Sequence, residues 1–301
     1  MTTNEPAGPA PAPAPAPDAD ADAAHGADAA PGARRAAQLS PVSRTALAVA
    51  RVRAYESSRP EPLFTDPYAL AFIAASGTPL PTAGPDRPLA RLLVTRGIMR
   101  TRFYDDRLPA AGARQVVLLA AGLDTRAYRL AWPAGTRLFE VDLPAVLDFK
   151  QWVLDEQGAR AACERVALPA DLADPGWTDR LLAAGFDPGR PTVWLAEGLL
   201  VYLDAEQAAA LLTAVGGLSA PGSSLFTEQA RDVFRVPAEA GLAEMTALWR
   251  GGLGAGTADW LDAHGWRTGF TAMDAFAASL GRELPPSGFE GAGFLEAVRT
   301  A

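Results

Sequence analysis

The chain has 301 residues, of which 49% are hydrophobic and 21% charged, which is typical of a globular protein with an apolar core. It contains no apolar run near the roughly 18 to 20 residues that span a bilayer, and its net charge of −8 offers no basic excess to a nucleic acid, so we expect neither a membrane nor a nucleic-acid partner. One cysteine excludes an internal disulfide, and two histidines, His25 and His264, leave too few ligands for a Cys or His metal centre.

Residues 1–38 differ in composition from the rest of the chain. They are mainly Ala, Pro, Asp and Gly, with almost no large aliphatic or aromatic side chains. Because such a segment buries too little apolar surface to offset the entropy of ordering it, we expect it to be disordered. It also lacks the apolar stretch of a secretory signal, so we expect a cytoplasmic protein. Residues 39–301 are expected to form one domain.

Helical patterns begin that domain. Apolar spacing predicts a helix from Ser43 to Tyr55. The sequence Asp66-Pro67-Tyr68 is typical of an N-cap followed by proline at the first helical position, and a further helix is predicted from Pro88 to Leu108. We therefore expect residues 39–112 to form an N-terminal helical cap on a core made by residues 113–301.

Apolar runs alternate with helix-length segments after Gly112. This alternation predicts an α/β fold with a doubly wound, mostly parallel, seven-stranded sheet covered by helices on both faces. The last two runs lie closer together and favour an antiparallel edge. The predicted strands are 115–121, 136–142, 164–170, 191–197, 223–229, 265–272 and 294–300.

The residues that follow the predicted strands are candidates for ligand binding, because doubly wound sheets bind ligands beyond the carboxyl ends of their strands. Gly122 and Asp124 follow the first predicted strand, and Asp142, Asp171 and Glu197 end or follow the next three. Carboxylates in these places suit a ligand that carries hydroxyl and amino groups. The sequence thus predicts a small-molecule site at this edge of the sheet.

The spacing of Gly122 and Asp142 indicates a nucleoside. A glycine turn with a carboxylate about 20 residues later is the arrangement in which the carboxylate binds ribose hydroxyls. A dinucleotide needs several glycines so that a helix N-terminus can receive its pyrophosphate, whereas Gly122 stands nearly alone and is followed by Leu123 and Asp124. An aspartate there repels a diphosphate and tolerates a cationic sulfonium, so we expect S-adenosylmethionine and not NAD.

The same stretch resembles a known family. Residues 115–150 (QVVLLAAGLDTRAYRLAWPAGTRLFEVDLPAVLDFK) are similar to the core of the leucine carboxyl methyltransferase family, and most of all to its actinobacterial branch of S-adenosylmethionine-dependent methyltransferases. The segments 51–57, 63–69 (LFTDPYA), 100–106 (RTRFYDD) and 194–203 (WLAEGLLVYL) match as well. The resemblance therefore covers nearly everything from about residue 40. It implies a class I methyltransferase fold, Rossmann-like, with S-adenosylmethionine as cofactor.

The resemblance also implies one residue for each contact with the cofactor. The implied contacts are Gly122 in the cofactor loop, Asp142 at the ribose hydroxyls, Asp171 and Leu172 at the adenine, Glu197 beside the methionine ammonium and Arg100 at the methionine carboxylate. Arg102 competes with Arg100 for the last role, and Arg53 is a weaker match for a basic residue in the same region.

Each of these residues has a structural alternative. Asp142 and Asp171 could instead be carboxylates that end a strand and cap the next helix, and Glu197 could be the partner of a nearby arginine. Arg126 and Arg129 are expected to make ion pairs on a helix face, and Arg102 fits an i,i+4 pair with Asp106 on the same grounds.

The implied activity is transfer of a methyl group from S-adenosylmethionine to an oxygen of a small molecule, a carboxylate or a hydroxyl. A carboxylate is preferred, since it is already ionised at neutral pH and the sequence shows no obvious general base. A phenol would need a base such as His264. The alternatives are a non-catalytic S-adenosylmethionine-binding module and, less favoured, an NAD-dependent dehydrogenase. Residues 230–257, with Trp249 and a Gly-rich exit, are either a lid or a helix packed on the sheet.

Overall fold

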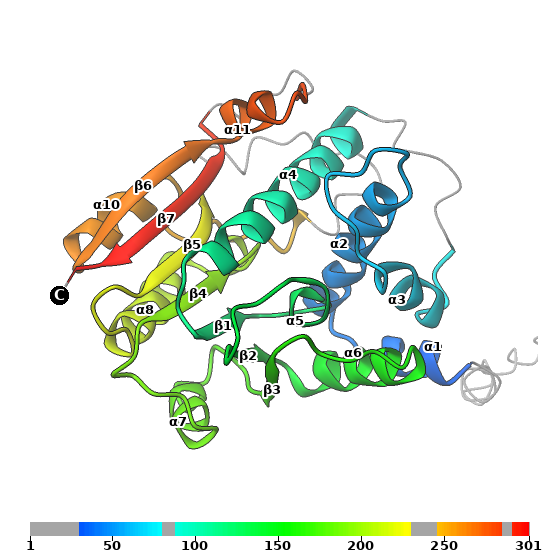
Figure 1. Ribbon diagram of the computed structural model, residues 1–301, viewed down its shortest axis with the longest axis horizontal. Coiled ribbons are helices and arrows are strands. Elements are labelled where there is room, and N and C mark those ends of the chain that lie inside the picture. Colours follow the sequence, from blue (N-terminus) through cyan, green and yellow to red (C-terminus); the bar gives the residue numbers. More distant parts are fainter. Residues whose placement is uncertain (1–29, 80–87, 230–245, 285–290, 301) are drawn as a thin grey trace, which may run out of the picture.

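The computed structural model describes residues 30–79, 88–229, 246–284 and 291–300, and it is built on one seven-stranded sheet (Figure 1). The strand order is β3-β2-β1-β4-β5-β7-β6, with helices packed on both faces, so the predicted α/β class and doubly wound sheet are confirmed. The strands are β1 (Gln115–Leu119), β2 (Arg137–Asp142), β3 (Glu164–Pro169), β4 (Thr192–Ala196), β5 (Ser224–Gln229), β6 (Trp266–Ala272) and β7 (Gly293–Arg299).

The strand directions create the crevice in which a ligand would bind. β1 pairs in parallel with β2 on one side and with β4 on the other. The connections that leave β1 and β4 therefore run in opposite directions across the sheet, and their carboxyl ends flank the switch point. β7 is antiparallel to both β5 and β6, so the predicted antiparallel edge is confirmed, with β7 inserted between its two neighbours.

Helices precede the first strand, as the sequence predicts. They are α1 (Pro31–Ala37), α2 (Pro41–Ser57), α3 (Ala69–Ala75) and α4 (Pro88–Ala110). The helices and short 3-10 turns that follow are α5 (Arg126–Arg129), α6 (Pro144–Glu156), α7 (Trp177–Ala183), η2 (Leu200–Tyr202), α8 (Ala205–Gly217), η4 (Gly254–Gly256), α10 (Thr257–Ala263) and α11 (Met273–Ser279). In the part of the chain that the structure describes, no helix is both long enough and apolar enough to cross a membrane.

The apolar side chains of β1 show how the core is divided. Val116 and Leu118 belong to a buried cluster that includes Phe103 of α4 and residues of α11. Val117 and Leu119 belong to the cluster on the other face, with the apolar side chains of α7 and α8. Since successive side chains of a strand point to opposite faces, a continuous apolar run is what a strand buried on both sides requires.

The expectation of disorder through residue 38 is wrong for residues 31–37, which form α1. This helix has almost no large apolar side chains, but Gly32 and Ala36 are buried against its neighbours. A Cβ atom at Gly32 would lie 2.5 Å from the carbonyl oxygen of Ala75 and 2.7 Å from the ring of Trp152. Small residues thus let α1 approach α3 and α6 closely, which composition alone does not reveal. Residues 1–29 lie outside the described residues.

The predicted cap at Asp66 is also different in the structure. Helix α3 begins at Ala69, and its N-cap residue is Tyr68, without a side-chain capping bond. The Asp66 carboxylate instead accepts the backbone N–H of Tyr68 through one oxygen and the Nε of Arg53, 2.7 Å away, through the other. Asp66 therefore shapes the turn before the helix and ties it to α2.

Candidate functional site

The loop after β1 brings together the two residues whose spacing suggests a nucleoside. The backbone N–H of Gly122 donates to Oδ2 of Asp142 over 2.6 Å, and the N–H of Leu143 donates to Oδ1 over 2.7 Å. Gly122 has a φ of +51°, and a Cβ there would lie 3.3 Å from the Cβ of Ala46, so both backbone conformation and space favour glycine. Each Asp142 oxygen keeps a lone pair that can accept a further hydrogen bond.

A cavity of about 360 Å³ opens beside this loop, and we call it the Asp142 cavity. Its volume is in the range of small-molecule sites. All of the residues predicted to bind the cofactor line it, as does Arg53. The predicted residues are Arg100, Gly122, Asp142, Asp171, Leu172 and Glu197, contributed by α4 and by the ends of β1, β2, β3 and β4.

The structural alternatives for these carboxylates are partly correct. Oδ1 of Asp171 accepts the backbone N–H of Ala173 over 2.9 Å, so Asp171 does shape the turn that follows β3. Glu197 is indeed the partner of arginines: Oε1 accepts Nε of Arg100 over 2.9 Å and Oε2 accepts a terminal nitrogen of Arg126 over 2.6 Å. Both residues therefore make a local bond and also line the Asp142 cavity.

Arg126 has a larger role than the helix-face ion pair predicted for it. Its side chain is only 2% exposed and forms ion pairs with Asp105, Asp124 and Glu197. These carboxylates come from α4, from the loop after β1 and from the end of β4. One guanidinium therefore joins three elements, and two of its partners, Asp124 and Glu197, line the Asp142 cavity. Arg129, as predicted, pairs with Asp105 over 2.6 Å.

These contacts set the ionisation of the cavity wall. Burial alone would raise the pKa of Asp124, but Arg126 and more distant cations outweigh it and lower that pKa to about 2. Burial opposes ionisation of Glu197 as well, and Arg126 and Arg100 again dominate, so its pKa is lowered. The pKa of Asp142 is raised, because burial outweighs its backbone hydrogen bonds. Asp124 and Glu197 are thus held as anions beside the cavity.

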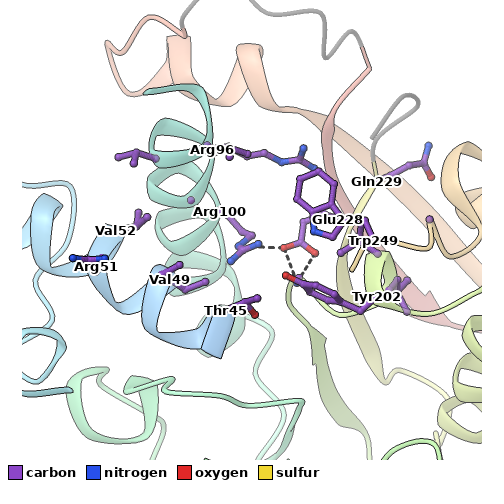
Figure 2. Close-up of a pocket in the computed structure, with 18 of the residues that line it drawn as sticks. Thr45, Val49, Arg51, Val52, Arg96, Arg100, Tyr202, Glu228, Gln229 and Trp249 are labelled. Atoms are coloured by element: carbon purple, nitrogen blue, oxygen red, sulfur yellow. Dashed lines mark hydrogen bonds and ion pairs between the residues drawn. The ribbon is translucent and has the colours of Figure 1, made fainter. Parts of the chain in front are cut away.

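A second cavity, of about 470 Å³, adjoins the first, and we call it the Trp249 cavity (Figure 2). Its wall is largely apolar, with side chains from α2 and α4 facing Trp249 and Leu253. Arg96, Arg100 and Glu228 are among the charged residues on it. The residues common to both cavities are Thr45, Val49, Arg100, Gly198 and Tyr202.

The sequence did not single out Glu228, which lines the Trp249 cavity and contacts two residues of the shared wall, Arg100 and Gly198. It sits near the carboxyl end of β5, and both of its oxygens accept the backbone N–H of Gly198, at 3.1 and 2.9 Å. It also forms an ion pair with Nε of Arg100 over 3.3 Å. Glu228 could have been identified from the same pattern as Glu197, since each is a carboxylate at the end of a strand.

Two sequence candidates do not reach either cavity. Arg102 bonds to Asp106 through Nε, the predicted i,i+4 pair, and to the carbonyl of Leu63, so it faces away from the cavity walls. His264 is exposed at the end of α10, with Nδ1 2.6 Å from the carbonyl oxygen of Trp260 and its ring stacked on that indole. It lines neither cavity, and the idea of His264 as a base for a phenol is wrong for this geometry.

The possible lid is only partly visible. Residues 230–245 of the segment 230–257 lie outside the described residues. Within the remainder, Trp249, Gly251, Leu253 and Gly254 line the Trp249 cavity. This part of the segment is therefore a wall of the second cavity.

The two arginines on α4 allow a matched test. Replacing Arg100 by methionine removes a cation from the wall of the Asp142 cavity, and we expect it to weaken binding of S-adenosylhomocysteine, measured by calorimetry, by about 10- to 100-fold. Arg102→Met should change the dissociation constant by less than about twofold, because Arg102 lines neither cavity. Equal losses in the two variants would contradict the assignment of Arg100 to the cavity.

The chain is similar to proteins of a known family. The sequence profile of the leucine carboxyl methyltransferase family matches residues 46–216. A protein of Frankia alni, named "Putative S-adenosyl-L-methionine-dependent methyltransferase", is 52% identical over 86% of this chain and 94% of its own. A protein of Parafrankia with the same description is 50% identical over 81% and 83% of the two chains.

Among solved structures, a "putative methyltransferase" of Thermobifida fusca superposes with a TM-score of 0.50 at 19% identity. The superposition covers 84% of this chain and 94% of the other. At that identity the likeness concerns the fold alone. On the family profile and on the identity to the Frankia and Parafrankia proteins, this chain belongs to the leucine carboxyl methyltransferase family.

Proposed function

We propose that the protein transfers a methyl group from S-adenosylmethionine to an oxygen atom of a small molecule, a carboxylate or a hydroxyl. The observation that carries this proposal is the pair of adjoining cavities. One gathers the residues that suit the cofactor, the other is a largely apolar chamber, and they share the wall formed by Arg100, Gly198 and Tyr202. A methyl donor and its acceptor must meet in line, and adjoining cavities make that possible.

The lining of the Asp142 cavity fits the cofactor. The open lone pairs of Asp142 suit the ribose hydroxyls, and the absence of a Cβ at Gly122 leaves the loop close to Ala46. Glu197 offers a negative charge to the methionine ammonium, and Arg100 offers a positive one to its carboxylate. Asp171 and Leu172 line the same cavity, and we assign the adenine to them.

Methyl transfer then requires the protein mainly to orient the acceptor and to exclude water. Bound in the Asp142 cavity, S-adenosylmethionine supplies a methyl group already activated by the sulfonium charge. The aliphatic and aromatic walls of the Trp249 cavity hold an apolar acceptor and keep water from competing with it. Arg96 and Arg100 add positive charge near the place where an acceptor oxygen carries negative charge.

The two alternatives are less well supported. A dinucleotide would bring its pyrophosphate to the loop where Asp124 is held ionised, with a pKa of about 2, so like charges would meet. A non-catalytic binding module needs only the Asp142 cavity, and the adjoining Trp249 cavity has no role in it.

Ligand binding tests this proposal directly. Calorimetry should detect binding of S-adenosylhomocysteine to the purified protein and no binding of NAD. With methyl-labelled S-adenosylmethionine and a panel of small carboxylic acids and phenols, label should appear on oxygen. Binding of NAD without binding of S-adenosylhomocysteine would reverse the assignment of the cofactor. Label found on nitrogen or carbon would refute O-methylation and leave the cofactor assignment intact.

A further inference from the structure

We propose that Glu228 is a catalytic residue that takes the proton of an acceptor hydroxyl, so that the acceptor of this enzyme is an apolar phenol or enol. The inference rests on the proposed function and narrows its two acceptor classes to one. It also corrects the expectation that the chain holds no general base for such an acceptor.

The position of Glu228 is the first argument. It lines the Trp249 cavity and not the Asp142 cavity, and it is the one carboxylate among the described residues that line the former. Its side chain is 11% exposed. In Figure 2 its carboxylate lies between Arg100 and Tyr202, which both belong to the shared wall. An acceptor oxygen that meets the methyl donor across this wall therefore lies near Glu228.

The way Glu228 is held is the second argument. The backbone N–H of Gly198 and the Nε of Arg100 fix the carboxylate from the protein side. A carboxylate has about four lone-pair sites, so positions remain for a hydroxyl donor. Gly198 has a φ of +62°, and a Cβ there would lie 3.0 Å from a terminal nitrogen of Arg100, so the peptide that fixes Glu228 packs directly against the arginine.

The charges around Glu228 favour a base over a passive ion-pair partner. Helix α4 presents Arg96, Arg100 and the buried Tyr104, and the end of β4 presents Glu197. Burial raises the pKa of Glu228, Arg100 opposes that rise, and Glu197 adds to it. A carboxyl whose pKa moves toward neutrality is a better proton acceptor for a weakly acidic hydroxyl.

A carboxylate acceptor fits this junction poorly. The Nε of Arg100 already serves two carboxylates, Glu197 at 2.9 Å and Glu228 at 3.3 Å. With the methionine carboxylate of the cofactor at the same guanidinium, an acceptor carboxylate would be the fourth, and it would add like charge in a partly buried place. A neutral hydroxyl adds no charge when it binds. As it loses its proton, the negative charge that develops on its oxygen faces Arg100, and the proton neutralises Glu228.

The step balances without any further reactant. The O–H bond of the acceptor breaks and its proton passes to an oxygen of Glu228. An electron pair of the acceptor oxygen forms the bond to the methyl carbon as the sulfur–methyl bond breaks and its electron pair returns to sulfur. The proton on Glu228 is then released to solvent.

Paired probes with the same ring test the acceptor class. With methyl-labelled S-adenosylmethionine, the wild type should label 2-naphthol and not 2-naphthoic acid, and the rate on 2-naphthol should fall as the pH drops through the pKa of Glu228. Label on 2-naphthoic acid alone, or on no phenol of the panel while S-adenosylhomocysteine still binds, would overturn the inference. Failure to bind S-adenosylhomocysteine would instead refute the proposed function.

Substitution of Glu228 tests the role of the residue. Glu228→Gln should lower kcat on 2-naphthol by about 10²- to 10⁴-fold, and much less on 4-nitrophenol, which ionises near neutral pH without help. Binding of S-adenosylhomocysteine, and of 2-naphthol to that complex, should stay within about threefold of wild type by calorimetry, since an amide still accepts the bonds from Gly198 and Arg100. Asp106→Asn removes an exposed carboxylate of helix α4 that lines neither cavity, and it is the matched control.

An equal loss of kcat on 2-naphthol and on 4-nitrophenol would mean that Glu228 acts only through the structure, and would overturn the inference. So would an unchanged kcat in Glu228→Gln. If that variant does not fold, Glu228→Asp keeps the carboxylate and shortens its reach by one methylene. It should retain the pH profile with a reduced kcat.

Discussion

Asp142→Ala should abolish binding of S-adenosylhomocysteine, with a dissociation constant raised by more than about 100-fold. In the proposed binding mode the carboxylate accepts two ribose hydroxyls, and each hydrogen bond to a charged group is worth about 1.5 to 3 kcal/mol. The substitution also removes the carboxylate that accepts the Gly122 and Leu143 N–H groups. These two hydrogen bonds fix the loop after β1 beside the cavity. Isothermal titration of S-adenosylhomocysteine into both proteins measures the effect.

The variant should remain folded, because Asp142 lies at the edge of a cavity and its neighbours in β2 stay buried. Thermal unfolding checks this point. Asp148→Ala is the control: Asp148 is an exposed acid on the following helix, α6, and its loss should leave the dissociation constant unchanged. Wild-type affinity in Asp142→Ala would show that Asp142 only shapes the loop, the structural alternative raised by the sequence.

Arg126→Met should lower the free energy of unfolding by about 3 to 5 kcal/mol, as expected when one partner of a buried ion pair is removed. The side chain is enclosed, and its loss leaves Asp105, Asp124 and Glu197 without their shared cation. Urea denaturation at pH 7 measures the difference. Arg102→Met removes an exposed ion pair within α4 and one bond to the carbonyl of Leu63, and it should cost about 1 to 2 kcal/mol.

The dependence of the free energy of unfolding on pH tests the ion-pair explanation. In the wild type, the pKa of Asp124 is lowered to about 2, below its value in the unfolded chain, so its contribution to stability is full above the unfolded pKa and is lost as the pH falls through about 2. Without Arg126, burial acts on Asp124 and Glu197 with less opposition and raises their pKa values. The deficit of Arg126→Met should therefore shrink as the pH falls from 7 toward 4. A deficit independent of pH would contradict the ion-pair explanation.

Features that depend on local pattern could be predicted from the sequence. The seven strands follow from apolar runs, and the contact between Gly122 and Asp142 follows from one spacing rule, because both residues end adjacent parallel strands. The choice of Arg100 over Arg102 could not be made from spacing. It depends on which face of α4 packs against the end of β4, and that is decided by the tertiary structure.

Features that depend on several distant segments were not predictable. Arg126 meets carboxylates from three separate elements, and nothing in its own helix distinguishes it from the ordinary ion-pairing of Arg129. The short helix α1 forms because small residues allow close packing against α3 and α6, although its composition is that of a disordered segment. Composition measures how much apolar surface a segment carries, and not how well a neighbouring surface fits it.

The insertion of β7 between β5 and β6 constrains how the chain can be assembled during synthesis. Residues 293–299 leave the ribosome after both of the strands that they join, so β5 and β6 wait with open backbone edges until β7 arrives. An open edge can pair with another chain, and aggregation competes with folding during that interval. A nascent chain that stops before residue 293 would keep both edges, and it would leave the strand that carries Glu228 without its neighbour on one side.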